Sequence, residues 1–496
     1  MPAWRSNTSD KPVPPTGPGS RVVALSDHVK RHVIPKTSVI EGYDLHFSMM
    51  SVCKLPDEIC RNEELMNTAR MLEARNSRLK QLPENIGDLT ALQSIDVHNN
   101  SISSLPASVA NLQSLSYLDV SKNGLRTLPM GLAQAAALSE VHASNNRIRS
   151  VPSKLPSTLV AMDLSHNAIR KLSRNVYGLP MRLNVSHNQL TGLPPISGKN
   201  VSSIHCIDAS NNHIAKLPSG LKHLCRLTTL NLSDNRLTEL PADLGQMRYI
   251  RHLDLSRNQL SAMPDELCLL HWSLHEFRVA GNQLQQLPAE FGLFRRLSVL
   301  DASSNKLERL PENFDALTSL RVVNLSGNQL IDVRAVVGLR SCEELNLSDN
   351  QIPELPDDLK SAESLVSLDV SRNRLTCLPD GLGYICTLKH LRAAGNELSE
   401  LPRTLGVAQL LVTLDLSDNH LELMPHDLRP LRSVETLILA GNRLSTLPRC
   451  FADVIFSLLH LDLSRNRLTG LVFPHSVVSL AVSGNPLYSA SEDPKG

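Results

Sequence analysis

The side chains in this sequence most suited to chemistry are histidines and cysteines. Zinc takes such ligands at short, characteristic spacings, and Cys53 and Cys60 are too isolated for that. Scattered histidines fall on strand or turn positions of nearby repeats, at His98, His142, His166 and His187. We interpret them as solvent-facing side chains and predict no metal site.

Catalytic motifs are also missing from the sequence. It has no phosphate-binding G-x-x-x-x-G-K-[ST], no H-E-x-x-H, no G-x-S-x-G and no C-x-x-C. Without a nucleophile–base pair or a phosphate loop, the sequence offers no set of residues that could form an active site. We therefore predict a protein that is not an enzyme, needs no cofactor and takes no small-molecule substrate.

A recurring apolar pattern organises the chain. Residues 227–241 read LTTLNLSDNRLTELP, and the next copy reads IRHLDLSRNQLSAMP with the same offsets. This is the leucine-rich-repeat signature L-x-x-L-x-L-x-x-N-x-L, present in about twenty copies. Its asparagine recurs mostly every 23 residues or so, at Asn100, Asn123, Asn146, Asn167, Asn188, Asn212, Asn235, Asn258, Asn282, Asn305, Asn328, Asn350, Asn373, Asn396, Asn419, Asn442, Asn466 and Asn485.

The pattern predicts which side chains are buried. Leu230 and Leu232 flank Asn231, so the leucines leave a short strand on one face and Asn231 on the other. Asn235 follows where the chain turns, and its amide can bond backbone groups that have no ladder partner. We expect stacked asparagines to form a ladder, and Asn235→Ala to destabilise the protein more than Asn231→Ala.

These features predict an α/β leucine-rich-repeat solenoid of about twenty repeats. We expect a curved horseshoe, with a parallel sheet on the concave side and short helices or turns on the convex side. The solenoid should span residues 39–488, with degenerate capping units at 39–80, where Met50 and Ser77 stand at asparagine positions. Residues 1–38 read as a disordered Pro/Ser-rich tail and 489–496 as a short tail.

Composition limits the compartment and the partners. The net charge is +1 and aromatic residues make up 3% of the chain, so we predict no nucleic-acid binding, with Lys and Arg interspersed with acids. Nine scattered cysteines favour free thiols in a reducing compartment. Because no signal peptide or membrane span is apparent, we predict a cytoplasmic protein.

The repeats, with L-P-x-x-L-x-x-L at a 23-residue step, resemble the intracellular class of Ras-suppressor-like scaffold proteins. The plant Ras-group repeat proteins and the repeat domains of Erbin and Scribble share this form, and the resemblance covers roughly residues 40–488. It implies a signal-transduction scaffold or adaptor that binds another protein on its concave face. A small GTPase, a phosphatase or a cytoskeletal component would be such a partner.

Two alternatives remain open at this point. The repeats around VPSKLPSTLVAMDLSHNAI shorten to 21 residues and are similar to bacterial effector repeats, which suggests an effector delivered into a host cell. The chain could also be the substrate-recruiting subunit of a ligase or phosphatase complex.

The concave face should carry a row of acids. The position between the second and third leucines is Asp or Asn in most repeats, and a serine usually follows two residues later. Acids about 4.8 Å apart repel unless they are bonded or interrupted. Five residues interrupt the row: His142, Arg278, Arg392, Ile438 and Ala481. Arg278 and Arg392 relieve repulsion, contact a partner, or do both.

Near the C-terminal end, the outward residues become apolar. We predict that the partner site is centred on Ile438 and Leu459. Its apolar members are Val412, Ile438, Leu459 and Val478, and its arginines are Arg443, Arg465 and Arg467 at the adjoining turns, with Arg392 and Arg278 further along the face.

Overall fold

The computed structural model describes residues 43–49, 53–178, 182–196, 204–425, 433–448, 451, 457–470 and 476–487. The chain divides into two compact units, Met1–Ile214 and Ala215–Gly496, hereafter the first and second units. The expected tails, 1–38 and 489–496, lie outside the described residues, as do Met50 and Val52 of the first repeat.

The first unit contains eight short strands that pair in parallel, each with the next along the chain. They are β1 (Tyr43–His46), β2 (Ala69–Glu73), β3 (Ser94–Asp96), β4 (Tyr117–Asp119), β5 (Glu140–His142), β6 (Ala161–Asp163), β7 (Arg182–Asn184) and β8 (Cys206–Asp208). All lie where the leucine pattern predicts a strand.

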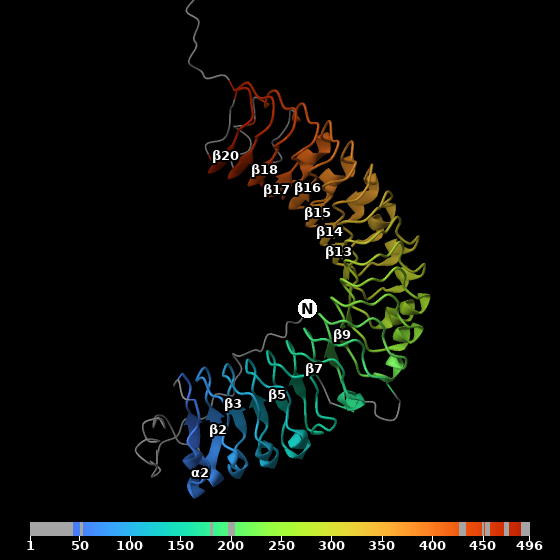
Figure 1. Ribbon diagram of the computed structural model, residues 1–496. Coiled ribbons are helices and arrows are strands. Elements are labelled where there is room, and N and C mark those ends of the chain that lie inside the picture. The colour runs from blue at the N-terminus through green and yellow to red at the C-terminus, as the bar shows by residue number, and fades with distance from the viewer. Residues whose placement is uncertain are drawn as a thin grey trace, which may run out of the picture. The chain divides into compact units, whose positions relative to one another are not determined.

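The second unit continues the same architecture with twelve strands in parallel register. They are β9 (Thr229–Asn231), β10 (His252–Asp254), β11 (Glu276–Arg278), β12 (Val299–Asp301), β13 (Val322–Asn324), β14 (Glu344–Asn346), β15 (Ser367–Asp369), β16 (His390–Arg392), β17 (Thr413–Asp415), β18 (Thr436–Ile438), β19 (His460–Asp462) and β20 (Ser479–Ala481). Within this unit, the strands line the inner side of an arc (Figure 1). The predicted solenoid fold is confirmed.

Short 3₁₀ helices lie opposite the strands. In the first unit these are η1 (Asp57–Cys60), η2 (Ile86–Asp88), η3 (Ala107–Asn111), η4 (Met130–Gln134) and η5 (Arg174–Gly178), with one α-helix, α2 (Glu63–Thr68). In the second unit they are η7 (Leu221–His223), η8 (Ala242–Gln246), η9 (Asp265–Trp272), η10 (Phe291–Leu293), η11 (Phe314–Ala316), η12 (Arg334–Gly338), η13 (Asp357–Ser361), η14 (Asp380–Tyr384) and η15 (Arg403–Val407). Among the described residues, no helix is long and apolar enough to cross a membrane.

Proline places the beginning of many of these helices. Pro241 precedes η8 with φ −73° and ψ 143°, and Pro264 precedes η9 with nearly the same angles. Proline fixes φ near −65° and has no N–H to leave unsatisfied, so it suits this position. The Leu–Pro pair of the repeat therefore marks the point where the chain enters the convex side.

The core is a stack of apolar layers between the strands and the 3₁₀ helices. Leu230, Leu232 and Leu237 have no exposed side-chain surface, and their counterparts in neighbouring repeats are buried in the same way. Phenylalanine replaces leucine at several inner positions of the second unit, where the rings of Phe291 and Phe314 stack with centroids 6.4 Å apart. No repeat encloses its own leucines, so each depends on its neighbours for burial.

The asparagine ladder links each repeat to the one before it. Asn258 Oδ1 accepts a hydrogen bond from Leu237 N at 2.9 Å, and Nδ2 donates to Leu232 O at 3.0 Å, both in the preceding repeat. Nδ2 also donates to Leu255 O at 2.9 Å and Ser256 O at 3.2 Å in its own turn. One amide thus satisfies four backbone groups. In the capping unit Ser77 takes this place, and its hydroxyl donates to Phe47 O at 2.6 Å.

Asn258 and Asn324 provide a matched test of this ladder. We expect Asn258→Ala to lower the free energy of unfolding by about 1–3 kcal/mol, because it leaves buried backbone groups without partners. Asn324→Ala should cost less than about 1 kcal/mol, since that side chain is half-buried and accepts only from Ser326, through N at 3.2 Å and Oγ at 2.8 Å. Equal shifts in the urea midpoint of the two variants would contradict the ladder's role.

Candidate partner-binding surface

The concave row of Asp and Asn side chains is bonded to its own turns. Asp301 Oδ1 accepts from Ser303 N at 3.1 Å and from Ser303 Oγ at 2.7 Å, and Asp415 is bonded to Ser417 in the same way. The serines therefore donate hydrogen bonds that stabilise the carboxylates without removing their charge. Part of the row is also buried: Asn231, expected to face solvent, is only 9% exposed, and its Oδ1 accepts from Ser233 N and Oγ.

Asp254 is an acid of this row whose pKa is changed by its surroundings. Burial raises the pKa of Asp254 above its ordinary value, while the bonds from Ser256 and the charge of Arg278 act in the opposite direction. Folding therefore makes the charged form of Asp254 less favourable than it is in the unfolded chain. Asn occupies the equivalent position in other repeats without any charge to bury.

Arg278 interrupts the row and is held by its own strand. Its guanidinium forms an ion pair with Glu276, whose other oxygen lies 2.9 Å from His252 Nδ1. The bond from His252 and the charge of Arg278 hold the pKa of Glu276 below its ordinary range. Arg278 also lies in register between Asp254 and Asp301. It is a partly buried member of an internal network.

Arg392 differs from Arg278 although it interrupts the row in the same way. It lies in register between Asp369 and Asp415, yet its side chain is exposed. No ion pair of Arg392 occurs among the residues that the structure describes. It is the more accessible of the two concave arginines.

A second column of residues follows at the turn just before each ladder asparagine, and several of its members are charged. Residues here have positive φ, as in Asp234 (54°) and Arg257 (53°). Arg257 reaches back to Asp234 at 2.5 Å, while Gly281 of the next repeat leaves room for it: a Cβ on Gly281 would lie 3.2 Å from Arg257 Cγ. Gly281 therefore adopts the positive φ of this turn without strain, and its missing Cβ leaves space for the Arg257 side chain in the ion pair.

The structure does not bring the predicted C-terminal apolar residues together as one patch. Ile438 is half-buried on the concave face, between Asp415 and Asp462. Leu459 precedes strand β19, outside the strand positions that Ile438 and Asp462 occupy, and its side chain is exposed. Ile438 and the residues at the strand entries therefore form two separate rows, and their role as a partner site remains a prediction.

The second row precedes the strands and is only partly apolar. Backbone bonds join Val412, Glu435, Leu459 and Val478 in that order, so the exposed Glu435 separates half-buried Val412 from the others. Leu459 and Val478 are neighbours, exposed by 38% and 81%. The apolar surface of this row therefore consists of that pair.

The three predicted arginines also separate. Arg465 NH2 lies 3.2 Å from Asp418 Oδ1, two repeats back, across Gly441. Arg443 and Arg467 are exposed on the segments that leave the sheet after Asn442 and Asn466, and their backbone N–H groups bond to Leu421 O and Leu444 O. Of the three, Arg465 has an internal ionic partner.

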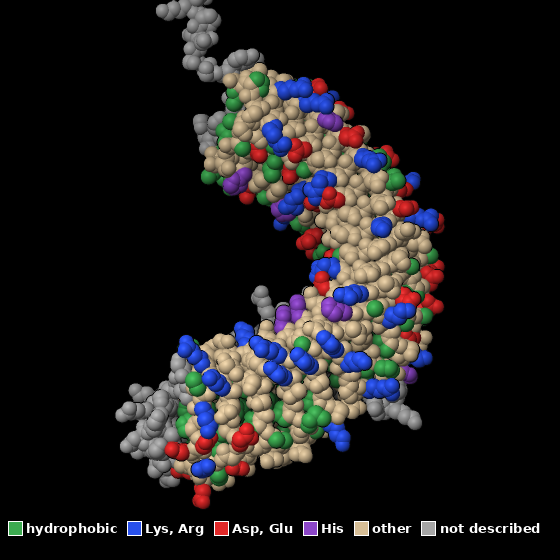
Figure 2. All heavy atoms as spheres, viewed as in Figure 1, with side chains coloured by type: hydrophobic (Ala, Val, Ile, Leu, Met, Phe, Trp, Pro, Cys, Tyr) green, Lys and Arg blue, Asp and Glu red, His purple; other side chains and the backbone are tan. Residues whose placement is uncertain are grey.

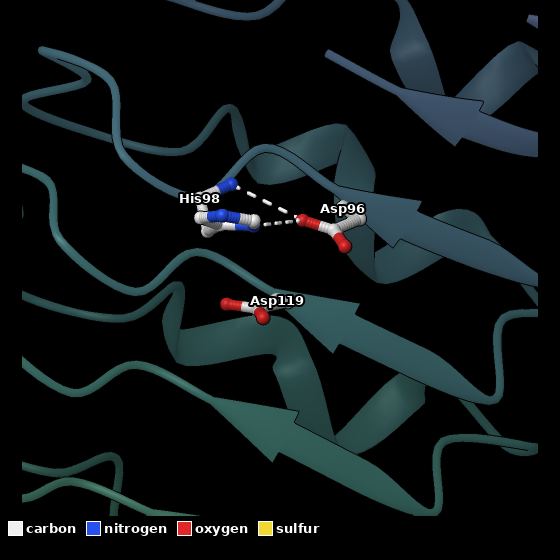
Figure 3. A group of neighbouring side chains, drawn as sticks. All are labelled: Asp96, His98 and Asp119. Carbon is white, nitrogen blue, oxygen red and sulfur yellow. Dashed lines mark hydrogen bonds and ion pairs between the residues drawn. The ribbon is translucent and has the colours of Figure 1, made fainter. Parts of the chain in front are cut away.

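One group of three potential metal ligands lies on the first unit, near its N-terminal strands. Asp96, His98 and Asp119 each place one ligand atom within 4.8 Å of the others (Figure 3). Their atoms are already used: Asp96 bonds His98 Nδ1 and Arg75 Nε, both at 2.8 Å, and Asp119 accepts from Ser121. The guanidinium beside Asp96 occupies the place of a cation, so the group reads as an internal ion-pair network.

The other histidines singled out in the sequence do not join this group. His166 and His187 stack with ring centroids 4.0 Å apart, and both are exposed. Burial and the neighbouring His187 lower the pKa of His166. His142 packs 5.3 Å from the ring of Tyr117. The four histidines therefore occupy three separate places.

The shift at Asp254 predicts a pH-dependent effect. Because the pKa of Asp254 is raised on folding, its contribution to stability is present at low pH and is lost as pH rises through the carboxyl range. Asp254→Asn keeps the acceptor for Ser256 without the charge. We expect a higher urea midpoint at pH 7 and a smaller gain at acidic pH, with the reverse variant Asn231→Asp lowering the midpoint at pH 7. An increase in the urea midpoint of Asp254→Asn that becomes larger towards acidic pH would contradict a raised pKa at Asp254.

Comparison with protein families finds repeats in both units. A family model described as a leucine-rich repeat region matches residues 57–157, and one described as leucine rich repeat matches 273–330. A third, also leucine rich repeat, matches 226–247, 249–270 and 457–480. Curated relatives match short segments: mouse leucine-rich repeat serine/threonine-protein kinase 1 is 46% identical over 59 residues, and rabbit fibromodulin 39% over 66. These cover 12% and 13% of this chain, but only 3% of the kinase and 45% of fibromodulin.

Solved structures resemble the chain over most of its length. YopM from Yersinia enterocolitica is 29% identical, with a TM-score of 0.65, covering 88% of this chain and 91% of that one. A leucine-rich-repeat protein of Leptospira interrogans is 26% identical, with a TM-score of 0.58, covering 82% and 91%. The plant receptor RGFR1, solved in complex with RGF2, is 22% identical with a TM-score of 0.65, covering 87% and 80%, and shows the shared fold. These comparisons show that the chain carries leucine-rich repeats stacked as a solenoid.

Proposed function

We propose that this chain is a non-enzymatic scaffold or adaptor that binds another protein on the concave sheet of its second unit. The observation that carries this proposal is the pair of interruptions at Arg392 and Ile438. Neither side chain can accept the bond that Asp or Asn makes with the turn. Arg392 also relieves repulsion between Asp369 and Asp415, whereas Ile438 offers the row no such benefit, and a role in binding accounts for its apolar side chain there.

The two interruptions offer complementary contacts. Arg392 is exposed beside Asp369 and Asp415 and can form forked bonds with a carboxylate on a partner. Ile438, two strands further, supplies apolar surface that loses water on docking, at about 25 cal/mol per Å² before ordering costs. Leu459 and Val478 extend the surface beyond the strand starts. A folded signalling or cytoskeletal protein, such as a small GTPase or a phosphatase, suits a surface of this mixed character.

We place this activity in the cytoplasm. The eight described cysteines are free thiols, spread over both units, which is the state expected in a reducing compartment. Cys450 lies outside the described residues. The likeness to bacterial repeat proteins from Yersinia and Leptospira supports a second candidate, an effector acting inside a host cell. The host-cell candidate would be favoured if the chain were secreted by the cell that makes it.

Substitutions that introduce charge test the concave site. We expect Ile438→Asp to weaken binding of the principal partner, identified by proximity labelling in the native cell, by tenfold or more in Kd, which is about 1.4 kcal/mol of binding free energy. Leu459→Asp should have a smaller effect, because its row is separate. The control changes, Gln93→Asp and Ser116→Asp in the first unit, should leave binding unchanged. Circular dichroism and the melting temperature should be near wild type throughout. Loss with the controls and not with Ile438→Asp would place the site in the first unit.

The scaffold proposal also predicts the absence of turnover. The purified chain should show no phosphatase, nucleotide-hydrolysis or ubiquitin-transfer activity, because no nucleophile–base pair was found in the sequence. A reproducible activity that follows the monodisperse protein through successive columns would refute this.

A further inference from the structure

The charges of the first unit are not evenly mixed, contrary to what the near-zero net charge led us to expect. The whole chain has 50 Lys and Arg and 49 Asp and Glu. Between residues 97 and 207, however, ten basic residues accompany only three acids. Those acids, Asp119, Glu140 and Asp163, all lie on strands β4, β5 and β6. The remaining faces of these repeats therefore carry basic charge alone.

Many of these basic side chains lie on one flank. Arg126, Arg149 and Arg170 each stand three residues after the ladder asparagine of successive repeats. Arg149 N donates to Arg126 O at 3.2 Å, so these two are direct neighbours along the stack. Parallel segments lie about 4.8 Å apart, which spaces the arginines as a continuous row. Lys122, Arg147 and Lys171 lie beside the row. We call these six residues the basic flank.

All six side chains of the basic flank are exposed. Figure 2 shows a stripe of Lys and Arg across the first unit, over the region of β2 to β7. No ion pair involving the six occurs among the described residues; the one bond from a guanidinium is Arg170 Nε to Gln189 Oε1 at 3.2 Å. In the second unit, by contrast, several arginines are paired, such as Arg257 with Asp234 and Arg372 with Asp349.

An unpaired row of like charges raises the free energy of the folded chain through mutual repulsion. In the second unit several bases have an acid beside them, as Arg257 has Asp234. We propose that the basic flank is a second binding surface, separate from the concave site, that takes an extended acidic segment of a partner protein. Arginine forks bind carboxylates in two-point fashion, and a row of them follows a segment lying along the stack.

Other polyanions fit this surface less well. Single-stranded nucleic acid needs aromatic side chains for stacking, whereas Tyr177 is buried and Tyr117 lies on strand β4 of the concave face. Stable attachment to an anionic membrane takes a second, apolar signal, and the row is interleaved with polar Thr127 and Ser150. A narrow acidic chain meets the arginines alone.

Binding of a labelled oligo-glutamate peptide, followed by fluorescence anisotropy at about 50 mM salt, tests this proposal. The variant with Arg126→Gln, Arg149→Gln and Arg170→Gln should bind about ten- to a hundredfold more weakly than wild type. The matched control replaces three exposed arginines of the second unit, Arg248→Gln, Arg295→Gln and Arg403→Gln, with the same change in net charge. It should bind within about twofold of wild type.

Further arms separate the ligand classes. Oligo-glutamine should not bind, and replacing the three flank arginines by lysine should retain part of the affinity, because the charge remains and the fork is lost. Equal losses in the two triple variants would overturn the proposal, as would failure of the peptide to bind wild type. Tighter binding of duplex DNA or phosphatidylserine vesicles, lost in the flank variant, would assign the surface to that class and refute ours.

The test is independent of the concave site. Ile438→Asp should leave peptide affinity unchanged, and the flank variant should leave binding of the concave partner unchanged. If Ile438→Asp does not weaken binding of the concave partner but the flank variant loses affinity for oligo-glutamate, the basic flank remains supported and the proposed concave site does not.

Discussion

The rest of the structure depends on the hydrogen bonds that one asparagine amide makes in each repeat. The side-chain oxygen of each ladder asparagine accepts a hydrogen bond from the preceding repeat, and its amide nitrogen donates to backbone oxygens of two successive turns. The strands contain only three to five residues in most repeats, too few to hold a sheet together by themselves. The ladder supplies the missing bonds in a region that water cannot reach, where an unmet donor or acceptor is costly.

The ladder also explains why variable repeat lengths are tolerated. The bond to Asn167 Oδ1 measures 2.9 Å after a repeat of 21 residues, and the bonds to Asn282 and Asn485 measure 3.0 Å although those repeats differ in length. The difference is absorbed by the 3₁₀ helices and turns of the convex side, such as eight-residue η9 against three-residue η10. The side that carries the ladder is therefore the rigid one, and the concave surface inherits its regularity.

Much of this follows from the sequence because the leucine and asparagine positions report burial directly. The strands, the ladder and the serine bonds of the acid row lie where the pattern places them. Other features depend on geometry that the pattern does not encode. Leu459 lies before its strand whereas Ile438 lies within one, and a glycine lets Arg465 reach Asp418 over an intervening repeat. The basic flank was hidden by a net charge that averages over both units.

Because the ladder bonds join each repeat only to its immediate neighbours, they have a consequence for how the gene of such a protein can change. Duplication of one whole unit inserts an asparagine, its leucines and its turn together, so the new copy finds every partner that the old one had. Deletion removes the same set without leaving an orphan. Surface residues such as Arg126, Arg149 and Arg170 can then be multiplied along with the scaffold, and a row of identical contacts is the natural product of that history.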